Sequence, residues 1–229
     1  MYMNPSLARY CSGRVCASLN KQRYESHLSK VPDPRILVCT GPAGTGKTML
    51  ACKYAVQHLY DRNYEKLIIT RPNVSIEEEL GYLPGTMEQK MNPWMIPIFD
   101  YLEKFTDRRT VRNYINEGLI EITPLGFMRG RTFDNTLVVA DEMQNSTNSQ
   151  MVNLLTRIGK DSKLVITGDL SQCDLPNVEN GLQTFLYRWN KYTDGNDTDL
   201  IDYVQLDRSD VKRSEVVSVV LDIYDINDH

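Results

Sequence analysis

The stretch that decides the fold reads Gly41-Pro42-Ala43-Gly44-Thr45-Gly46-Lys47-Thr48. It matches the pattern GxxxxGK[ST], in which backbone N–H groups wrap around phosphate oxygens and glycines leave room for that approach. An apolar run at 36–39 precedes the stretch and a helical pattern at 49–60 follows it. This strand, loop and helix context is what the motif requires. The stretch therefore predicts a phosphate-binding loop, at which the helix adds its positive dipole end.

Two side chains of the phosphate-binding loop predict how a nucleotide and a metal ion are held. Lys47 places a positive charge on the β- and γ-phosphates, and the Thr48 hydroxyl can ligate Mg²⁺. The loop from Gly41 to Thr48 as a whole is the candidate nucleotide-binding set. The alternative is a glycine-rich turn that binds nothing, and the flanking strand and helix patterns count against it.

Composition predicts a globular protein with a slightly acidic balance. The chain has 229 residues, of which 41% are hydrophobic, and a net charge of −4. That length allows one domain with a substantial core, and that charge means that nucleic-acid binding needs a local basic patch. The five cysteines are scattered and form no CxxC pair, which indicates neither zinc nor a disulfide framework. No apolar run reaches membrane-spanning length and no signal region opens the chain, so we expect a cytoplasmic protein without a membrane partner.

Short apolar runs alternate with helical patterns along the chain. The runs lie at 36–40, 67–70, 119–123, 137–141 and 164–167, with a weaker one at 203–206. This alternation is typical of an α/β fold with a mostly parallel central sheet and helices on both faces. We expect the strand of the phosphate-binding loop to lie beside the strand that ends at Thr167, with the Asp141 strand on the far side of that strand.

Residues between the predicted strands give several helices and one loop. A short helix is predicted at 19–30. Helical spacing of apolar residues predicts another at 91–105, in which Pro97 requires a kink or a later start. A third is predicted at 142–159, with its methionines as core filler rather than a binding surface. The polar, acidic stretch at 190–202 is predicted to be a loop.

Two of the predicted strands end in polar groups that suit nucleotide hydrolysis. One ends at Asp141, which can hold the hydration shell of Mg²⁺, followed by Glu142, which can polarise an attacking water. A simple GTPase or nucleotide kinase does not need that glutamate. The other strand ends in Thr167, Asp169 and Gln172, which would face the γ-phosphate and could sense its presence. The alternative for the first pair is a strand that ends in an acidic turn.

Several stretches, in order along the chain, resemble the PhoH family. They are Thr70-Arg71-Pro72, Gly81-Tyr82-Leu83-Pro84-Gly85, Met128-Arg129-Gly130-Arg131-Thr132, Asp141-Glu142-Met143-Gln144-Asn145 and the run at 166–176. LGYLPG at 80–85 and MRGRT at 128–132 are specific to that family. The phosphate-binding loop and GDxxQ are shared with superfamily 1 helicases, whose motor half the family is similar to. The resemblance extends from about residue 36 to residue 224.

This resemblance implies a RecA-like phosphate-loop ATPase that hydrolyses ATP with Mg²⁺, associates with RNA and often forms ring-shaped oligomers. It implies phosphate and metal roles for Lys47 and Thr48, a metal role for Asp141, the catalytic base in Glu142 and the sensor in Gln172. We accordingly expect a poorly ordered leader at 1–18, followed by a single RecA-like domain at 19–229 with its core at 36–224.

The chain departs from the family where adenine is read. The family has an Asn-Gln pair three residues before a tyrosine, whereas here the stretch is Asn20-Lys21-Gln22-Arg23-Tyr24. The glutamine is displaced, so the resemblance leaves an adenine contact at Gln22 open.

An arginine is also expected near the transferred phosphate, where it can raise the rate by roughly 10³–10⁵-fold. The candidates are Arg71, Arg129, Arg131 and Arg213, and Arg213 resembles the late arginine motif of the family. Superfamily 1 helicases place this arginine on a second motor domain. We expect a neighbouring subunit of a homo-oligomer to supply it here.

Basic and aromatic residues give local support for nucleic-acid binding. Phe127 interleaves with Arg129 and Arg131, and a second basic cluster comprises Lys104, Arg108, Arg109 and Arg112. Trp94 and Tyr82 could stack on bases, although Trp94 also suits a core. The leading hypothesis is an ATPase that remodels RNA or single-stranded nucleic acid. The alternatives are an ATP-regulated binding or assembly module with slow hydrolysis and no strand separation, and a phosphate-loop kinase, in which Glu142 would be surplus.

Overall fold

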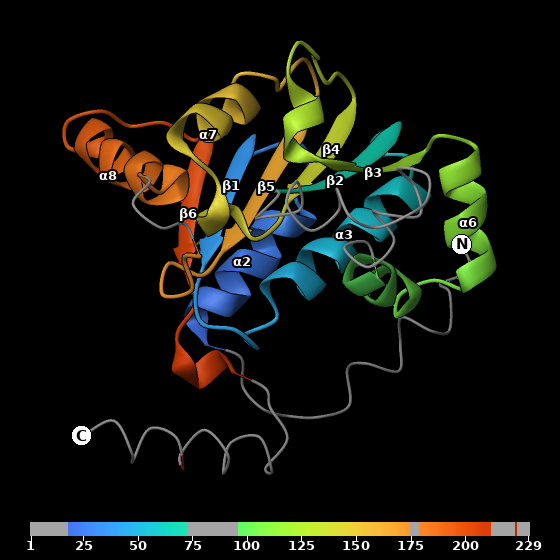
Figure 1. Ribbon diagram of the computed structural model, residues 1–229, viewed down its shortest axis with the longest axis horizontal. Coiled ribbons are helices and arrows are strands. Elements are labelled where there is room, and N and C mark those ends of the chain that lie inside the picture. The colour runs from blue at the N-terminus through green and yellow to red at the C-terminus, as the bar shows by residue number, and fades with distance from the viewer. Residues whose placement is uncertain (1–17, 73–95, 175–178, 212–222, 224–229) are drawn as a thin grey trace, which may run out of the picture.

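A computed structural model describes residues 18–72, 96–174, 179–211 and 223 of the chain (Figure 1). The predicted leader other than Ser18, the LGYLPG stretch, Trp94 and Arg213 lie outside the described residues. No helix among the described residues is long and apolar enough to cross a membrane.

A six-stranded parallel sheet forms the centre of the described structure (Figure 1). Its strands are β1 (Ile36–Thr40), β2 (Lys66–Arg71), β3 (Ile120–Pro124), β4 (Thr136–Ala140), β5 (Lys163–Gly168) and β6 (Ile201–Gln205). They are arranged in the order β3-β2-β4-β5-β1-β6, and each neighbouring pair is parallel. The predicted placement of the three central strands is therefore confirmed, because β5 lies between β1 and β4.

Helices cover both faces of this sheet, as predicted. They are α2 (Leu19–Ser29), α3 (Lys47–Tyr60), α6 (Arg108–Asn116), α7 (Asn148–Leu155) and α8 (Gly181–Thr193), with 3₁₀ turns η1 (Leu125–Met128), η2 (Met143–Asn145) and η3 (Arg208–Asp210). Residues 96–103 are also helical.

Successive strand residues point to opposite faces of the sheet, which divides the core in two. Leu37 and Cys39 of β1 belong to the cluster under α2, α3 and α6, whereas Val38 belongs to the cluster under α7 and α8. Figure 1 shows the two helix layers on either side of the strands. Burial on both faces explains why these strands read as continuous apolar runs.

The structure shortens two predicted segments, the helix at 142–159, which ends already at Leu155, and the loop at 190–202. The helix predicted from residue 142 begins only at Asn148, because Thr147 and Gln150 form a capping box there that satisfies the first backbone N–H groups. Residues 143–145 form the separate turn η2 instead. The loop predicted at 190–202 is also shorter, because α8 continues to Thr193 and β6 already begins at Ile201.

The contact between α7 and α8 depends on a glycine. A Cβ at Gly181 would lie 2.4 Å from the carbonyl oxygen of Thr147 and 3.0 Å from the Cβ of Met151. The backbone N–H of Gly181 donates to the carbonyl of Ser146 at 2.7 Å, which holds the two helix starts together. Since backbone atoms cannot yield cheaply to a new methyl group, α8 would have to move.

We predict that Gly181→Ala lowers the free energy of unfolding by about 1–3 kcal/mol, because of this overlap. Urea unfolding followed by circular dichroism measures it. Gly126→Ala is the matched control: nothing lies within 4 Å of its added methyl group, so its change should stay below about 0.5 kcal/mol. Equal unfolding midpoints for the two variants would contradict the prediction.

Candidate nucleotide-binding site

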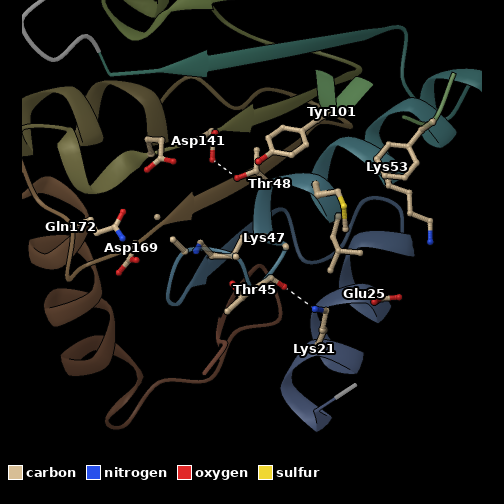
Figure 2. A pocket seen from close by; sticks show the side chains of 18 residues that line it. Lys21, Glu25, Thr45, Lys47, Thr48, Lys53, Tyr101, Asp141, Asp169 and Gln172 are labelled. Atoms are coloured by element: carbon tan, nitrogen blue, oxygen red, sulfur yellow. Dashed lines mark hydrogen bonds between the residues drawn. The ribbon is translucent and has the colours of Figure 1, made fainter. Parts of the chain in front are cut away.

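A cavity of about 620 Å³ opens at the carboxyl ends of the central strands (Figure 2). It is lined by most of the phosphate-binding loop, by the two acidic residues after β4, and by residues after β5. The lining comprises Ala43 to Leu50, together with Lys21, Glu25, Lys53, Tyr101, Phe105, Asp141, Glu142, Gly168, Asp169 and Gln172. The side chains predicted for phosphate, metal, base and sensor roles therefore line one cavity: Lys47, Thr48, Asp141, Glu142 and Gln172.

Glycines allow the phosphate-binding loop its conformation. Gly44 and Gly46 have φ values of 84° and 90°, in the left-handed region that disfavours side chains. At Gly41, a Cβ would lie 2.6 Å from the carbonyl oxygen of Leu206 after β6. The Lys47 ammonium donates to the carbonyls of Gly41 and Pro42 at 2.6 and 2.9 Å, so the side chain curls over the loop and carries its charge there.

Helix α2 supports the loop from the side through Lys21, which sequence reasoning missed. Its buried ammonium donates to the carbonyl of Thr45 at 2.7 Å (Figure 2) and to that of Asp210 at 3.3 Å. The Tyr24 hydroxyl donates to the carbonyl of Lys47 at 3.2 Å. Gln22 is exposed and does not line the cavity, so the residue of this stretch at the cavity is Lys21. The displacement of the glutamine in the sequence was the signal that could have pointed to Lys21.

Asp141 is the centre of a hydrogen-bonded cluster. One carboxylate oxygen accepts from the hydroxyls of Thr48, at 2.6 Å (Figure 2), and Thr167, at 2.5 Å. The other accepts from the Arg71 guanidinium, with Nε at 2.8 Å. Asp141 is buried, and its charge is balanced by that arginine. The arginine candidate Arg71 is therefore engaged with the predicted metal residue.

Thr48 and Asp141 fit Mg²⁺ by their chemistry. Mg²⁺ prefers hard oxygen ligands and is commonly held by one or two carboxylates together with nucleotide phosphates. A hydroxyl and a carboxylate lie within hydrogen-bond distance at the end of the phosphate-binding loop. Among the described residues, no three His, Cys, Asp or Glu side chains gather as a metal site.

Glu142 and Gln172 also line the cavity, and both side chains are exposed. The backbone of Glu142 is left-handed, with φ of 55°, which turns the chain sharply after β4. Its carboxylate accepts from the amide of Gln144 at 2.7 Å. Gln172 follows β5, where its backbone N–H donates to the carbonyl of Asp169 at 3.0 Å.

The cavity continues beyond the phosphate-binding loop, toward the helix at 96–103 and its continuation. Tyr101 and Phe105 line this end, together with Lys53 of α3 and Glu25 of α2. Burial, and then the Asp141 charge, raise the pKa of the Tyr101 hydroxyl. The sequence predicted this helix but did not indicate that it lines the site. Its aromatic residues have the spacing of core residues, which hides that contribution.

Of the other candidate arginines, Arg131 is bound to a carboxylate, whereas Arg129 is exposed to solvent. Two guanidinium nitrogens of Arg131 donate to the Glu121 carboxylate at 2.5 and 2.9 Å, and Lys66 also donates to it, at 2.6 Å. Hydrogen bonds from Arg131 and then Lys66 lower the pKa of Glu121 to about 2. The MRGRT stretch is thereby fastened to strand β3.

The strand order, the phosphate-binding loop and the acidic end of β4 define an α/β fold of the RecA-like phosphate-loop NTPases. A large terminase from a thermophilic bacteriophage has a similar fold, with a TM-score of 0.50 and 12% identity, over 90% of this chain and 49% of that one. The family model described as PhoH-like protein matches residues 16–225. The chain therefore belongs to the PhoH family, which confirms the resemblance drawn from its motifs.

Similar proteins also support membership of the PhoH family. The chain is 43% identical over 186 residues to a PhoH-like protein of Bacillus subtilis, covering 81% of this chain and 56% of that protein. It is 33% identical over 201 residues to Protein PhoH of Escherichia coli, covering 86% of this chain and 55% of that protein. The chain thus spans a little more than half the length of these relatives.

We predict that Glu121→Gln lowers the free energy of unfolding by about 1–2 kcal/mol at pH 7, after allowance for its partial exposure. The folded-state pKa of Glu121 is lowered from 4.5 to about 2, so this stability is present above pH 4.5 and is lost as the pH falls toward 2. The difference between wild type and variant should shrink over that window.

Chemical unfolding at pH 7, 4 and 2.5 measures the difference. Exposed Glu117 at the end of α6 provides the control, since Glu117→Gln should change stability by less than about 0.5 kcal/mol. A Glu121→Gln difference that does not depend on pH would contradict the assigned cause.

Proposed function

We propose that the protein is a cytoplasmic ATPase that hydrolyses ATP with Mg²⁺. The observation that carries this proposal is the arrangement of the two acidic residues after β4. Asp141 contacts the Thr48 hydroxyl of the phosphate-binding loop, while Glu142 lines the same cavity with an exposed carboxylate. A site that only binds phosphate needs the loop alone, whereas hydrolysis also needs a group that can take a proton from water.

Each residue then has one task. Backbone N–H groups of residues 43–48 and the Lys47 ammonium hold the phosphates, and Thr48 and Asp141 would hold Mg²⁺. When bound there, Mg²⁺ would neutralise charge that develops on the phosphates. Glu142 orients a water for in-line attack on the γ-phosphorus and accepts its proton, while the bond from the γ-phosphorus to the β,γ-bridging oxygen breaks and ADP leaves. Gln172 contacts the γ-phosphate and reports its presence to the loop after β5.

The proposal includes work on RNA or single-stranded nucleic acid by a homo-oligomer, which could be a ring. Helix α6 supports the nucleic-acid part, because Arg109 and Arg112 are exposed on it at the β3 end of the sheet (Figure 1). Arg71 and Arg131 are each paired with a carboxylate of the same chain. This supports an oligomer, because the arginine near the transferred phosphate is then sought elsewhere. A neighbouring subunit would supply the arginine that stabilises the transition state, and Arg213 is the proposed residue for that role.

We predict that Glu142→Gln lowers the turnover of ATP by about 10²–10⁴-fold, because the amide cannot accept the proton. Affinity for ATP with Mg²⁺ should stay within about threefold, since phosphate contacts are unchanged. Phosphate release and nucleotide-binding titration measure the two quantities. Glu25→Gln, the same change at another wall of the cavity, should leave turnover near wild type. A wild-type rate in Glu142→Gln would remove Glu142 as the base.

The same assay tests the other parts of the proposal when it is run with and without RNA over a range of protein concentrations. Stimulation by RNA is expected, and specific activity should fall on dilution as subunits separate. Slow hydrolysis that ignores RNA would instead favour an ATP-regulated binding or assembly module. A specific activity that stays constant into clearly monomeric conditions would count against an arginine from a neighbouring subunit.

For the nucleic-acid surface, we predict that Arg109→Ala combined with Arg112→Ala weakens RNA binding at least threefold and reduces its salt dependence, because phosphate contacts release counterions. Fluorescence anisotropy with a single-stranded RNA at several salt concentrations measures both. The control combines Arg188→Ala and Lys191→Ala on α8, which lies at the opposite end of the sheet (Figure 1). Equal effects of the two pairs would show that only the total charge matters.

A further inference from the structure

The segments that follow β4 and β5 are joined by a buried glutamine. Gln144 is 2% exposed. Its side-chain oxygen accepts from the backbone N–H of Asp169 at 3.0 Å, and its side-chain nitrogen donates to the Glu142 carboxylate at 2.7 Å. One amide therefore bonds the proposed base and the strand end that leads to the proposed sensor Gln172.

Close packing leaves this amide little freedom. A Cβ at Gly168 would lie 3.1 Å from the side-chain oxygen of Gln144 and 2.5 Å from the Cδ2 of Leu182 on α8. The Cys173 thiol contacts the backbone carbonyl of Gln144 at 3.4 Å. Side chains in close-packed surroundings occupy one well-defined conformation, so the amide nitrogen is presented to Glu142 in a fixed direction.

A second contact joins the same two segments without involving the Glu142 carboxylate. The Asn145 amide donates to the Asp174 carboxylate at 3.1 Å, and the backbone N–H of Asp174 donates to the side-chain oxygen of Asn145 at 2.9 Å. The two contacts share the task of holding the segments together. The contact of Gln144 differs because it also fixes the carboxylate that must meet the attacking water.

Glu142 needs such a fixed partner. Its side chain is exposed and its backbone is left-handed, so the local chain conformation alone leaves the carboxylate several rotamers. A general base acts only within hydrogen-bond reach of the proton that it removes, and small displacements are costly in rate. A hydrogen bond from a buried, immobile amide restricts the carboxylate to one position.

We propose that Gln144 is a positioning residue that holds the Glu142 carboxylate in place relative to the strand end carrying Asp169 and Gln172. This inference rests on the proposed ATPase function and deepens it. A change at Gln172 when the γ-phosphate is bound or lost would reach Glu142 through the backbone of Asp169 and the amide of Gln144.

The test compares variants that each remove side-chain hydrogen bonds from one of the two contacts between the segments. Gln144→Met keeps the length of the side chain and removes both hydrogen bonds. Gln144→Asn keeps the amide but is one methylene too short to span the same two partners. The matched control, Asp174→Ala, removes the carboxylate that accepts from Asn145 and leaves Gln144 and Glu142 untouched.

We expect both Gln144 variants to lower kcat about 10–100-fold while KM, and the affinity for a non-hydrolysable ATP analogue with Mg²⁺, stay within about threefold of wild type. Asp174→Ala should keep kcat within about threefold. In the Glu142→Gln background, Gln144→Met should lower the residual rate no further, because residues that act as a unit are not additive. Thermal unfolding of every variant reports folding separately; if Gln144→Met does not fold, Gln144→Asn decides.

The outcomes separate the inference from the function on which it rests. Wild-type turnover in a folded Gln144 variant, or an equal loss in Asp174→Ala, overturns the positioning role while Glu142→Gln remains inactive. A rise in KM with unchanged kcat overturns it as well. If wild type does not hydrolyse ATP, or Glu142→Gln hydrolyses it normally, the proposed function itself fails and the positioning role fails with it.

Discussion

The site depends on the pairing of one buried carboxylate. Asp141 accepts hydrogen bonds from Thr48, Thr167 and Arg71, which come from α3, β5 and β2. An unpaired charge at that depth would be strongly unfavourable, so the three donors must be present together. The constraint therefore acts in both directions: the sheet places the carboxylate, and the carboxylate contacts the start of α3 and the carboxyl ends of β2 and β5. The phosphate-binding loop is held against the sheet at the same point.

The strand order makes this meeting possible. In parallel strands, all carboxyl ends lie at one edge of the sheet, and in this order β5 separates β1 from β4. Cys39 of β1 is paired with Thr167 of β5, and Ala140 of β4 with Ile166 of β5, so the residues that follow each strand emerge side by side. The continuous apolar runs and the buried sheet faces specify these registers. The registers in turn bring together segments that are distant in sequence. Helix α2 and the turn after β6 contact the phosphate-binding loop from its other side, because the Lys21 ammonium bonds both that loop and the carbonyl of Asp210.

Much of this arrangement could be predicted from the sequence, because its signals are periodic or local. Six apolar runs predicted six strands, and polar residues that follow two of them were expected at one site and do line one cavity. What escaped prediction depends on contacts across the fold. Arg71, which pairs with Asp141, lies 70 residues away from it in the sequence, and no local pattern reveals this pair. Gln144 lay within a recognised motif, yet its two partners become visible only when β4 and β5 are side by side. The start of α7 was misplaced because apolar spacing from Met143 onward imitates a helix, whereas the Thr147 capping box decides the boundary.

Asp141 and Glu142 show how neighbouring residues of one type are placed in different environments. At the end of β4, the strand geometry directs Asp141 into the sheet edge, where donors surround it and its charge is compensated. One residue later the backbone enters the left-handed region, and the chain turns so that Glu142 is exposed to the cavity. A carboxylate with several fixed donors is suited to hold a cation, and one that retains access to water is suited to accept a proton. The left-handed turn therefore separates the two environments, and Gln144 donates a hydrogen bond to the carboxylate that is left exposed.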